Sequence, residues 1–258
     1  MLTLFTCPRA FEGHTGIIQT NALCSWRALG FGVSRPLVVL SDGTEPTPPD
    51  GPALRYVPVA CDAHGTPLVS SVFERGAAVA TTPLVGYVNS DIILLDDFMP
   101  AVERAAAAFP GPFLMIGQRI DLNVPLPLTF RLGWQTRLRK EAARRGTLHQ
   151  SAGIDYLVYR PGTLGELPPF ALARWRWDNW IVWHVLEQGH PVIDATRVIT
   201  AIHQNHDHSH HGEAGIQQTA LNDRLVHVTG GRLCRISDAT HIMTQDSIKI
   251  REKQISPQ

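Results

Sequence analysis

The sequence lacks the features that would place it at once in several large classes of protein. Lys plus Arg and Asp plus Glu both total 23, so no charge excess favours binding to nucleic acid. The four cysteines include no CxxC pair and are scattered as in a reduced protein without a disulfide framework. No apolar run reaches the roughly 18 residues that a membrane span requires. Residues 1–5 lack the basic region of a signal peptide, and we therefore expect a cytoplasmic protein.

Three well-known site motifs are missing as well. The sequence contains no G-x-G-x-x-G, no G-x-x-x-x-G-K-[ST] and no G-x-S-x-G. The first two motifs hold the phosphates of dinucleotides and nucleoside triphosphates, and the third places the nucleophile of α/β-hydrolases. Their absence disfavours a dinucleotide-dependent dehydrogenase, a P-loop NTPase and an α/β-hydrolase.

Short apolar runs alternate along the chain with stretches in which apolar residues recur at helical spacing. Strands are expected at 2–6, 36–40, 54–59, 84–95, 113–117, 154–159, 192–196 and 198–200, and helices at 16–29, 68–80, 97–109, 129–145, 179–188 and 214–228. This alternation predicts an α/β fold with a mixed, mostly parallel sheet flanked by helices. At 258 residues, 44% of them hydrophobic, the chain suits one domain. We expect that domain to cover residues 1–244, with a polar tail over 245–258.

Polar residues follow three of the predicted strands. Arg9 comes after the first strand and Asp42 after the second, and a polar triplet, Asn89, Ser90 and Asp91, interrupts the apolar run at 84–95. Because parallel strands end at the same edge of a sheet, these side chains should gather at one crevice. Oxygen ligands there suit a hard divalent cation and, through it, phosphates. The alternative is that Ser90 and Asp91 merely cap a helix that begins near residue 96.

Histidine is concentrated in one short segment of the chain. Five of the twelve histidines lie within residues 203–211. Imidazole is the commonest transition-metal ligand, and the alternation of His206, His208 and His210 could place three rings on one side of an extended segment. A zinc site made wholly from this segment lacks an H-E-x-x-H motif or a cysteine pair to support it. An exposed polar loop is the alternative.

Three features of the sequence belong together: the early strand–helix–strand order that ends at Ser41 and Asp42, the polar segment 87–91, and the segment 177–180 followed by 202–210. In these features the chain resembles GT-A-type glycosyltransferases, which transfer sugars from nucleotide-diphosphate sugars. The segment 87–91 stands at the position of the family's D-x-D motif. Asn89 stands where the family has its first aspartate. The resemblance covers most of the chain and implies a Rossmann-like, GT-A-like fold. It also implies a nucleotide-binding half near 1–120 and an acceptor-binding half near 121–244.

The family resemblance implies a role for several residues around the donor. Arg9, Asp42 and Arg75 would surround the nucleotide, together with Asn89 and Ser90 of the polar triplet. Asp91 and His203 would hold Mn²⁺ or Mg²⁺ against the diphosphate, where the cation neutralises charge on the leaving group.

A second group of residues would serve the acceptor, whose identity the sequence leaves open. Asp178, or in second place Asp155, would deprotonate the acceptor hydroxyl. Capping of a helix is an equally good interpretation of Asp178. Trp177, Asn179 and Trp180 would contact the acceptor. Trp175, Trp177 and Trp180 could stack on a sugar ring, although these tryptophans suit a hydrophobic core at least as well.

Three other functions fit parts of the pattern. They are a sugar-nucleotide nucleotidyltransferase, a non-catalytic nucleotide- or carbohydrate-binding module, and a zinc-dependent hydrolase built on the histidine-rich segment. The basic stretch from Arg131 to Arg145 is typical of a solvated helix face, and the alternative is peripheral contact with an anionic acceptor or a membrane surface.

Overall fold

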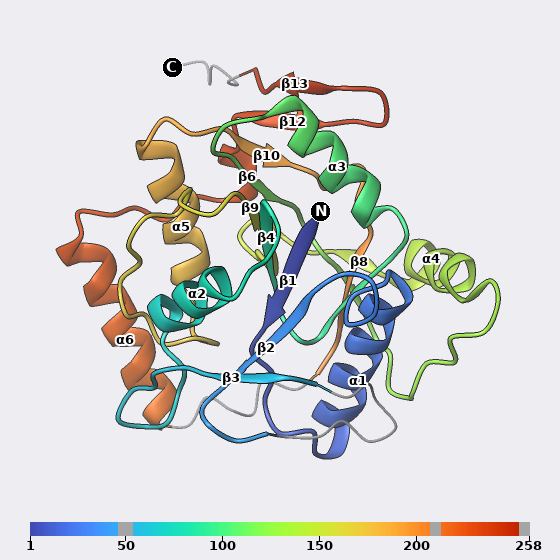
Figure 1. Cartoon of the computed structure of the whole chain (residues 1–258), viewed down its shortest axis with the longest axis horizontal. Coiled ribbons are helices and arrows are strands. Elements are labelled where there is room, and N and C mark those ends of the chain that lie inside the picture. The colour runs from blue at the N-terminus through green and yellow to red at the C-terminus, as the bar shows by residue number, and fades with distance from the viewer. Residues whose placement is uncertain (46–53, 207–212, 253–258) are drawn as a thin grey trace.

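The first four strands of the structure form one side of a large sheet. The computed structural model describes residues 1–45, 54–206 and 213–252 (Figure 1). In it, β1 (Leu2–Thr6) pairs in parallel with both β2 (Leu37–Ser41) and β4 (Leu84–Val88), and β2 pairs in parallel with β3 (Tyr56–Pro58). Every residue of β1 and β4 is buried, as is typical of central strands covered on both faces.

The second half of the chain extends the same sheet. Its strands are β6 (Leu114–Ile116), β9 (Tyr156–Tyr159), β10 (Val192–Asp194), β12 (His241–Met243) and β13 (Ile248–Ile250). The order across the sheet is β13-β12-β10-β6-β9-β4-β1-β2-β3. β9 and β13 run antiparallel to their neighbours, and the remaining pairs are parallel. The mixed, mostly parallel sheet predicted from the sequence is therefore confirmed.

A second, smaller sheet packs beside the first and changes the interpretation of the run at 84–95. The polar triplet at 89–91 divides this run into β4 of the large sheet and β5 (Ile92–Leu94) of the small one. The small sheet has the order β5-β11-β7-β8, with β11 (Ala201–Gln204), β7 (Ile120–Leu122) and β8 (Thr147–Leu148). The triplet is thus the point where the chain passes from one sheet to the other.

Helices cover both faces of the large sheet (Figure 1). They are α1 (Gly13–Ala28), α2 (Val69–Ala78), α3 (Phe98–Ala108), α4 (Trp134–Arg145), α5 (Trp177–Glu187) and α6 (Glu213–Val228), with a short 3₁₀ helix at Ile236–Asp238. Trp26 of α1 and Val102 of α3 belong to one hydrophobic cluster, and Phe73 of α2 and Ile181 of α5 belong to another. Full burial of each such side chain stabilises the fold by about 1.5–3 kcal/mol.

One glycine allows α2 to approach the sheet. A Cβ atom on Gly76 would lie only 2.7 Å from the ring of Phe5 in β1. The absence of a side chain therefore lets this helix, which leads the chain toward β4, lie directly against the aromatic ring.

Three sequence-based boundaries differ from the structure. The predicted polar tail begins too early, because Ile248–Ile250 pairs with β12 as β13. The helix predicted from residue 129 begins at Trp134, after Gly133 has adopted the left-handed conformation with φ of 78°. The strand predicted at 198–200 is found at Ala201–Gln204. Within the described part of the chain, no helix combines the length and apolar character needed to cross a membrane.

Candidate active site

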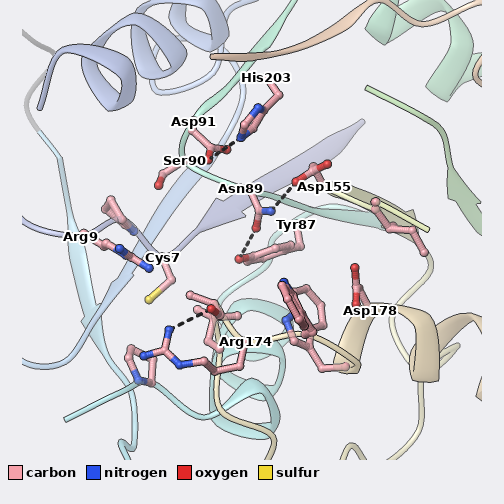
Figure 2. A pocket seen from close by; sticks show the side chains of 18 of the residues that line it. Cys7, Arg9, Tyr87, Asn89, Ser90, Asp91, Asp155, Arg174, Asp178 and His203 are labelled. Atoms are coloured by element: carbon pink, nitrogen blue, oxygen red, sulfur yellow. Dashed lines mark hydrogen bonds and ion pairs between the residues drawn. The ribbon is translucent and has the colours of Figure 1, made fainter. Parts of the chain in front are cut away.

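A cavity of about 810 Å³ lies where the parallel strands of the large sheet end. Arg9 after β1, Asp42 after β2 and Asp91 after β4 all line it. Figure 2 shows Arg9 and Asp91 at the cavity. The structure therefore brings together the three polar residues that the sequence placed at one crevice. The far wall comes from the later part of the chain, including Asp155 and Asp178.

Asp91, His203 and His206 converge at one corner of this cavity. In the small sheet, β11 pairs antiparallel with β5, and the register places His203 opposite Ile92, next to Asp91. Asp91 Oδ2 lies 3.5 Å from His203 Nε2 and 3.3 Å from His206 Nε2. One donor atom from each residue lies within 4.8 Å of the others, a spacing at which all three could bind one cation.

The surroundings of Asp91 leave room for such a cation. Its Oδ1 atom is buried and has no hydrogen-bond partner within the described part of the chain. Burial alone would raise the pKa of Asp91, but hydrogen bonds and charge from His203 and His206 outweigh burial and hold this pKa well below its usual range. An ionised carboxylate with an unsatisfied oxygen beside two imidazoles fits a divalent cation. His208, His210 and His211 lie outside the described residues.

Asn89 is occupied by contacts within the protein. Its Oδ1 accepts a hydrogen bond from the Tyr87 hydroxyl at 2.9 Å, and its Nδ2 donates to Asp155 Oδ1 at 2.8 Å (Figure 2). An aspartate here would place two carboxylates in contact without a donor between them. The amide at position 89 therefore links β4 to the residue before β9, and its oxygen faces Tyr87 rather than the histidines.

Ser90 helps to fix the loop that carries Arg9. The Ser90 hydroxyl donates to Gln19 Oε1 at 2.9 Å, and the same oxygen accepts the Arg9 backbone N–H at 2.8 Å. Gln19 Nε2 donates in turn to the Arg9 carbonyl at 3.0 Å. The loop after β1 is thus held to the polar triplet, while the Arg9 side chain remains exposed at the cavity.

Asp42 lies at the rim of the cavity in a tight turn. Its Oδ1 accepts hydrogen bonds from the Thr44 hydroxyl at 2.6 Å and the Thr44 backbone N–H at 3.0 Å. These bonds, the hydroxyl first, lower the pKa of Asp42. The ionised carboxylate is thereby held in a fixed orientation.

Asp178 and Asp155 differ sharply in their environments. Burial, followed by the charge of Asp155, raises the pKa of Asp178 to about 7, although backbone N–H groups of Asn179 and Ile154 act against this rise. Both oxygens of Asp155 accept hydrogen bonds from Arg119 Nη1 at 2.8–2.9 Å. Asp155 is thus engaged by a guanidinium, whereas Asp178, a carboxylate with a pKa near neutrality, suits a general base. Arg176, rather than Asp178, occupies the N-cap position of α5.

Two residues near His203 were not predicted from the sequence. The pairing of β11 with β7 places Asp121 opposite His203, with Asp121 Oδ1 3.3 Å from His203 Nδ1. Arg119 contacts Asp121 through Nε at 2.9 Å and also pairs with Asp155. The Arg119 guanidinium therefore connects Asp121, which contacts His203, with Asp155, which contacts Asn89.

The loop before α5 also contributes residues that sequence reasoning missed. Two of its non-glycine residues have positive φ angles, Ala173 at 59° and Arg176 at 98°. Arg174 lies between them at the cavity, and its Nε donates to Gln218 Oε1 at 2.7 Å. Burial, followed by the nearby positive charge of Arg9, lowers the pKa of Arg174. Strained backbone of this kind is concentrated at functional sites, but no local sequence signal marks it.

Several predicted site residues do not offer a free side chain to the cavity. Arg75 is exposed on α2 and is not among the cavity residues, because Phe73 and Val72 occupy the face of the helix toward the sheet. Trp180 belongs to the hydrophobic core and donates through Nε1 to Thr229. Asn179 lines the cavity, but its amide donates to the backbone carbonyls of residues 152 and 234.

Trp177 and Trp175 both line the cavity, but in different ways. Trp177 is buried, with its ring edge-to-face against Phe73 and Tyr87. Trp175, which the sequence analysis also offered for stacking on a sugar ring, has 65% of its surface exposed.

Comparison with known proteins defines the fold. No protein family matches the sequence, and neither does any curated protein. Among solved structures, the chain is similar to S. aureus TarS residues 1–349 in complex with UDP-GlcNAc, with a TM-score of 0.52 and 14% sequence identity. The match covers 88% of this chain and 65% of that chain, so this protein spans about two thirds of the TarS structure. The similarity confirms the GT-A-like fold predicted from the sequence.

Proposed function

We propose that this protein is a glycosyltransferase that moves a sugar from a nucleotide-diphosphate sugar to an acceptor hydroxyl with the help of a divalent cation. The observation that carries the proposal is the cluster of Asp91, His203 and His206 at one corner of the cavity, with the half-buried Asp178 on the opposite wall. The fold supports it, because TarS binds UDP-GlcNAc with a similar fold.

The donor would lie across the ends of β1, β2 and β4. Asp42 at the cavity would accept a hydrogen bond from the base, and Arg9 and Arg174 offer positive charge to the diphosphate. Burial weakens the solvation of Arg174, so a phosphate that pairs with it would recover the lost stabilisation. Asp91, His203 and His206 would hold the cation, which when bound neutralises negative charge on the nucleoside diphosphate.

Asp178 would act as the general base in an inverting transfer. It would accept the proton of the acceptor hydroxyl as that oxygen bonds to the anomeric carbon and the bond from that carbon to the phosphate oxygen breaks. The nucleoside diphosphate then leaves. The pKa of about 7 lets Asp178 be ionised at neutral pH while remaining basic enough to take this proton. The exposed Trp175 offers an aromatic face for an acceptor ring.

The donor atoms favour Mn²⁺ over Mg²⁺. Two imidazole nitrogens and one carboxylate make up the cluster, and Mg²⁺ prefers oxygen ligands in a strict octahedral geometry. We therefore expect Mn²⁺ to support nucleotide binding better than Mg²⁺.

Thermal shift against nucleoside diphosphates, with and without Mn²⁺, tests the proposal. At a ligand concentration near 100 times Kd, a bound nucleotide stabilises a protein by about 2.7 kcal/mol, which raises Tm by roughly 5–10 °C for a chain of this size. Asp91→Asn should abolish the Mn²⁺-dependent part of the shift. Asp246→Asn, an exposed aspartate outside the cavity, is the matched control and should leave it unchanged. If neither UDP nor GDP stabilises the unmodified protein, the proposed function is wrong.

Turnover of nucleotide sugars separates the proposal from its alternatives. Release of nucleoside diphosphate with transfer to an added acceptor supports the transferase, and donor binding without turnover supports a binding module. Two histidines and one carboxylate also suit a catalytic zinc ion. Stoichiometric zinc in the purified protein, with hydrolysis that needs no nucleotide, would instead support the zinc-dependent hydrolase.

A further inference from the structure

A basic stripe runs along the exposed face of α4. The helix carries five cationic residues and one acidic residue. Arg139 pairs with Asp96 and Asp97, and Arg145 pairs with Glu141. The other three cations, Arg137, Lys140 and Arg144, form no ion pair within the described residues, and their spacing of three and four residues places them on one face. Leu138 and Ala142 face the protein core instead.

Two exposed leucines precede this stripe in the chain. Leu132 is 100% exposed and Leu126 is 69% exposed. Arg137 Nη1 donates to the carbonyl of Leu132 at 2.9 Å, so the first cation of the stripe lies beside the more exposed leucine. Figure 1 shows α4 at the side of the molecule, with the loop before it extending outward.

The loop that carries Leu126 and Leu132 is held to the core near the active site. Buried Asn21 donates to the carbonyl of Leu126 at 3.2 Å and accepts the backbone N–H of Leu128 at 2.8 Å. Asn21 also donates to Gln204 Oε1 at 2.9 Å, one residue after His203. The backbone of the loop is therefore fixed at Leu126, whose apolar side chain is exposed to solvent.

We infer that Leu126, Leu132, Arg137, Lys140 and Arg144 form a docking surface for an anionic lipid membrane. Leu132 lies beside the first of three cations that form no ion pair within the described residues, and Leu126 is exposed earlier in the same loop. This combination matches the interfacial region of such a membrane, where apolar side chains insert and cations meet lipid phosphates. Nucleic acid offers the phosphates but no apolar layer for the leucines. This surface is separate from the cavity residues and does not depend on the proposed function.

Sedimentation of the full chain with lipid vesicles tests this inference. We expect binding to vesicles of phosphatidylcholine mixed with phosphatidylglycerol, little binding to phosphatidylcholine alone, and loss of binding as NaCl is added. The triple variant Arg137→Gln/Lys140→Gln/Arg144→Gln should lower the partition coefficient about a hundredfold, about fivefold for each cation. Leu126→Ser/Leu132→Ser should lower it at least about tenfold with the charges unchanged.

A matched control lies on the edge strand of the large sheet. Lys249→Gln/Ile250→Ser removes an exposed cation and an exposed apolar side chain from β13 and should leave vesicle binding unchanged. Unaltered Tm values would show that all variants fold. Equal binding to neutral vesicles, binding to neither vesicle, or no loss in the triple variant would each overturn the inference. Normal vesicle binding by the leucine variant would also overturn it, and competition by single-stranded DNA would then assign the basic stripe to nucleic acid.

Discussion

Replacing Asp178 by asparagine is predicted to lower catalytic activity and to raise the stability of the fold at neutral and higher pH. The pKa of Asp178 is about 7 in the folded protein and near the ordinary value of 3.8 in the unfolded chain. Between these values the folded state holds a proton that the unfolded state has released. Stability therefore falls as pH rises from about 4 to about 7, with a slope of about 1.4 kcal/mol per pH unit. Over roughly three units the loss reaches about 4 kcal/mol and persists above pH 7.

Asp178→Asn removes this pH-dependent loss, because the amide cannot ionise while its oxygen can still accept the backbone N–H groups. We expect the variant to be more stable than the unmodified protein at about pH 8 by a few kcal/mol, and the advantage to shrink toward pH 4. Urea unfolding at several pH values measures the difference. In the same variant, sugar transfer should fall by about 10²-fold or more, and the acidic limb of the pH–rate profile near pH 7 should disappear.

Two outcomes would refute this reasoning. A stability difference that does not change with pH would mean that Asp178 is not protonated at neutral pH in the folded protein. Full transfer activity in Asp178→Asn would mean that another group takes the acceptor proton. Asp246→Asn, an exposed aspartate, controls for the general effect of removing a negative charge.

Three further predictions follow from the packing and hydrogen bonds around the site. Asn89→Asp should destabilise the fold by about 2 kcal/mol at pH 8 and by less at pH 5, because the new carboxylate would face Asp155. Urea unfolding at both pH values measures this difference. A gain in Mn²⁺ affinity without loss of stability would contradict the structural role of the amide. Asp121→Asn should weaken Mn²⁺ binding about 10–100-fold in calorimetry, because it loosens the orientation of His203, and an unchanged affinity would show that the contact is incidental. Gly76→Ala should lower stability by about 1–3 kcal/mol despite the better helix propensity of alanine, whereas a rise in Tm would show that α2 can shift freely.

The fold and the first residues of the site follow from local patterns in the sequence. Arg9, Asp42 and Asp91 could be placed together because each follows an apolar strand, and parallel strands end at one edge. The order of strands and helices can be predicted without knowledge of tertiary contacts, because it follows from the periodicity of apolar residues along the chain.

The rest of the site depends on contacts that no local pattern encodes. Asp121 reaches His203 only because β7 and β11, about 80 residues apart in the chain, pair in the small sheet. The pKa of Asp178 depends on burial by distant segments and on the charge of Asp155. Arg174 is brought to the cavity by backbone that adopts positive φ at Ala173 and Arg176, which residue type alone does not predict.

The amide at position 89 also fixes the balance of charge at the cation site. With Asn89 committed to Tyr87 and Asp155, Asp91 is the only carboxylate that the described residues place in the cluster with the two histidines. A divalent cation held by one carboxylate and two neutral imidazoles keeps a net charge of about +1. The diphosphate must then supply the missing counter-charge. Cation and nucleotide should therefore bind with positive thermodynamic coupling, each raising the affinity for the other by the same factor.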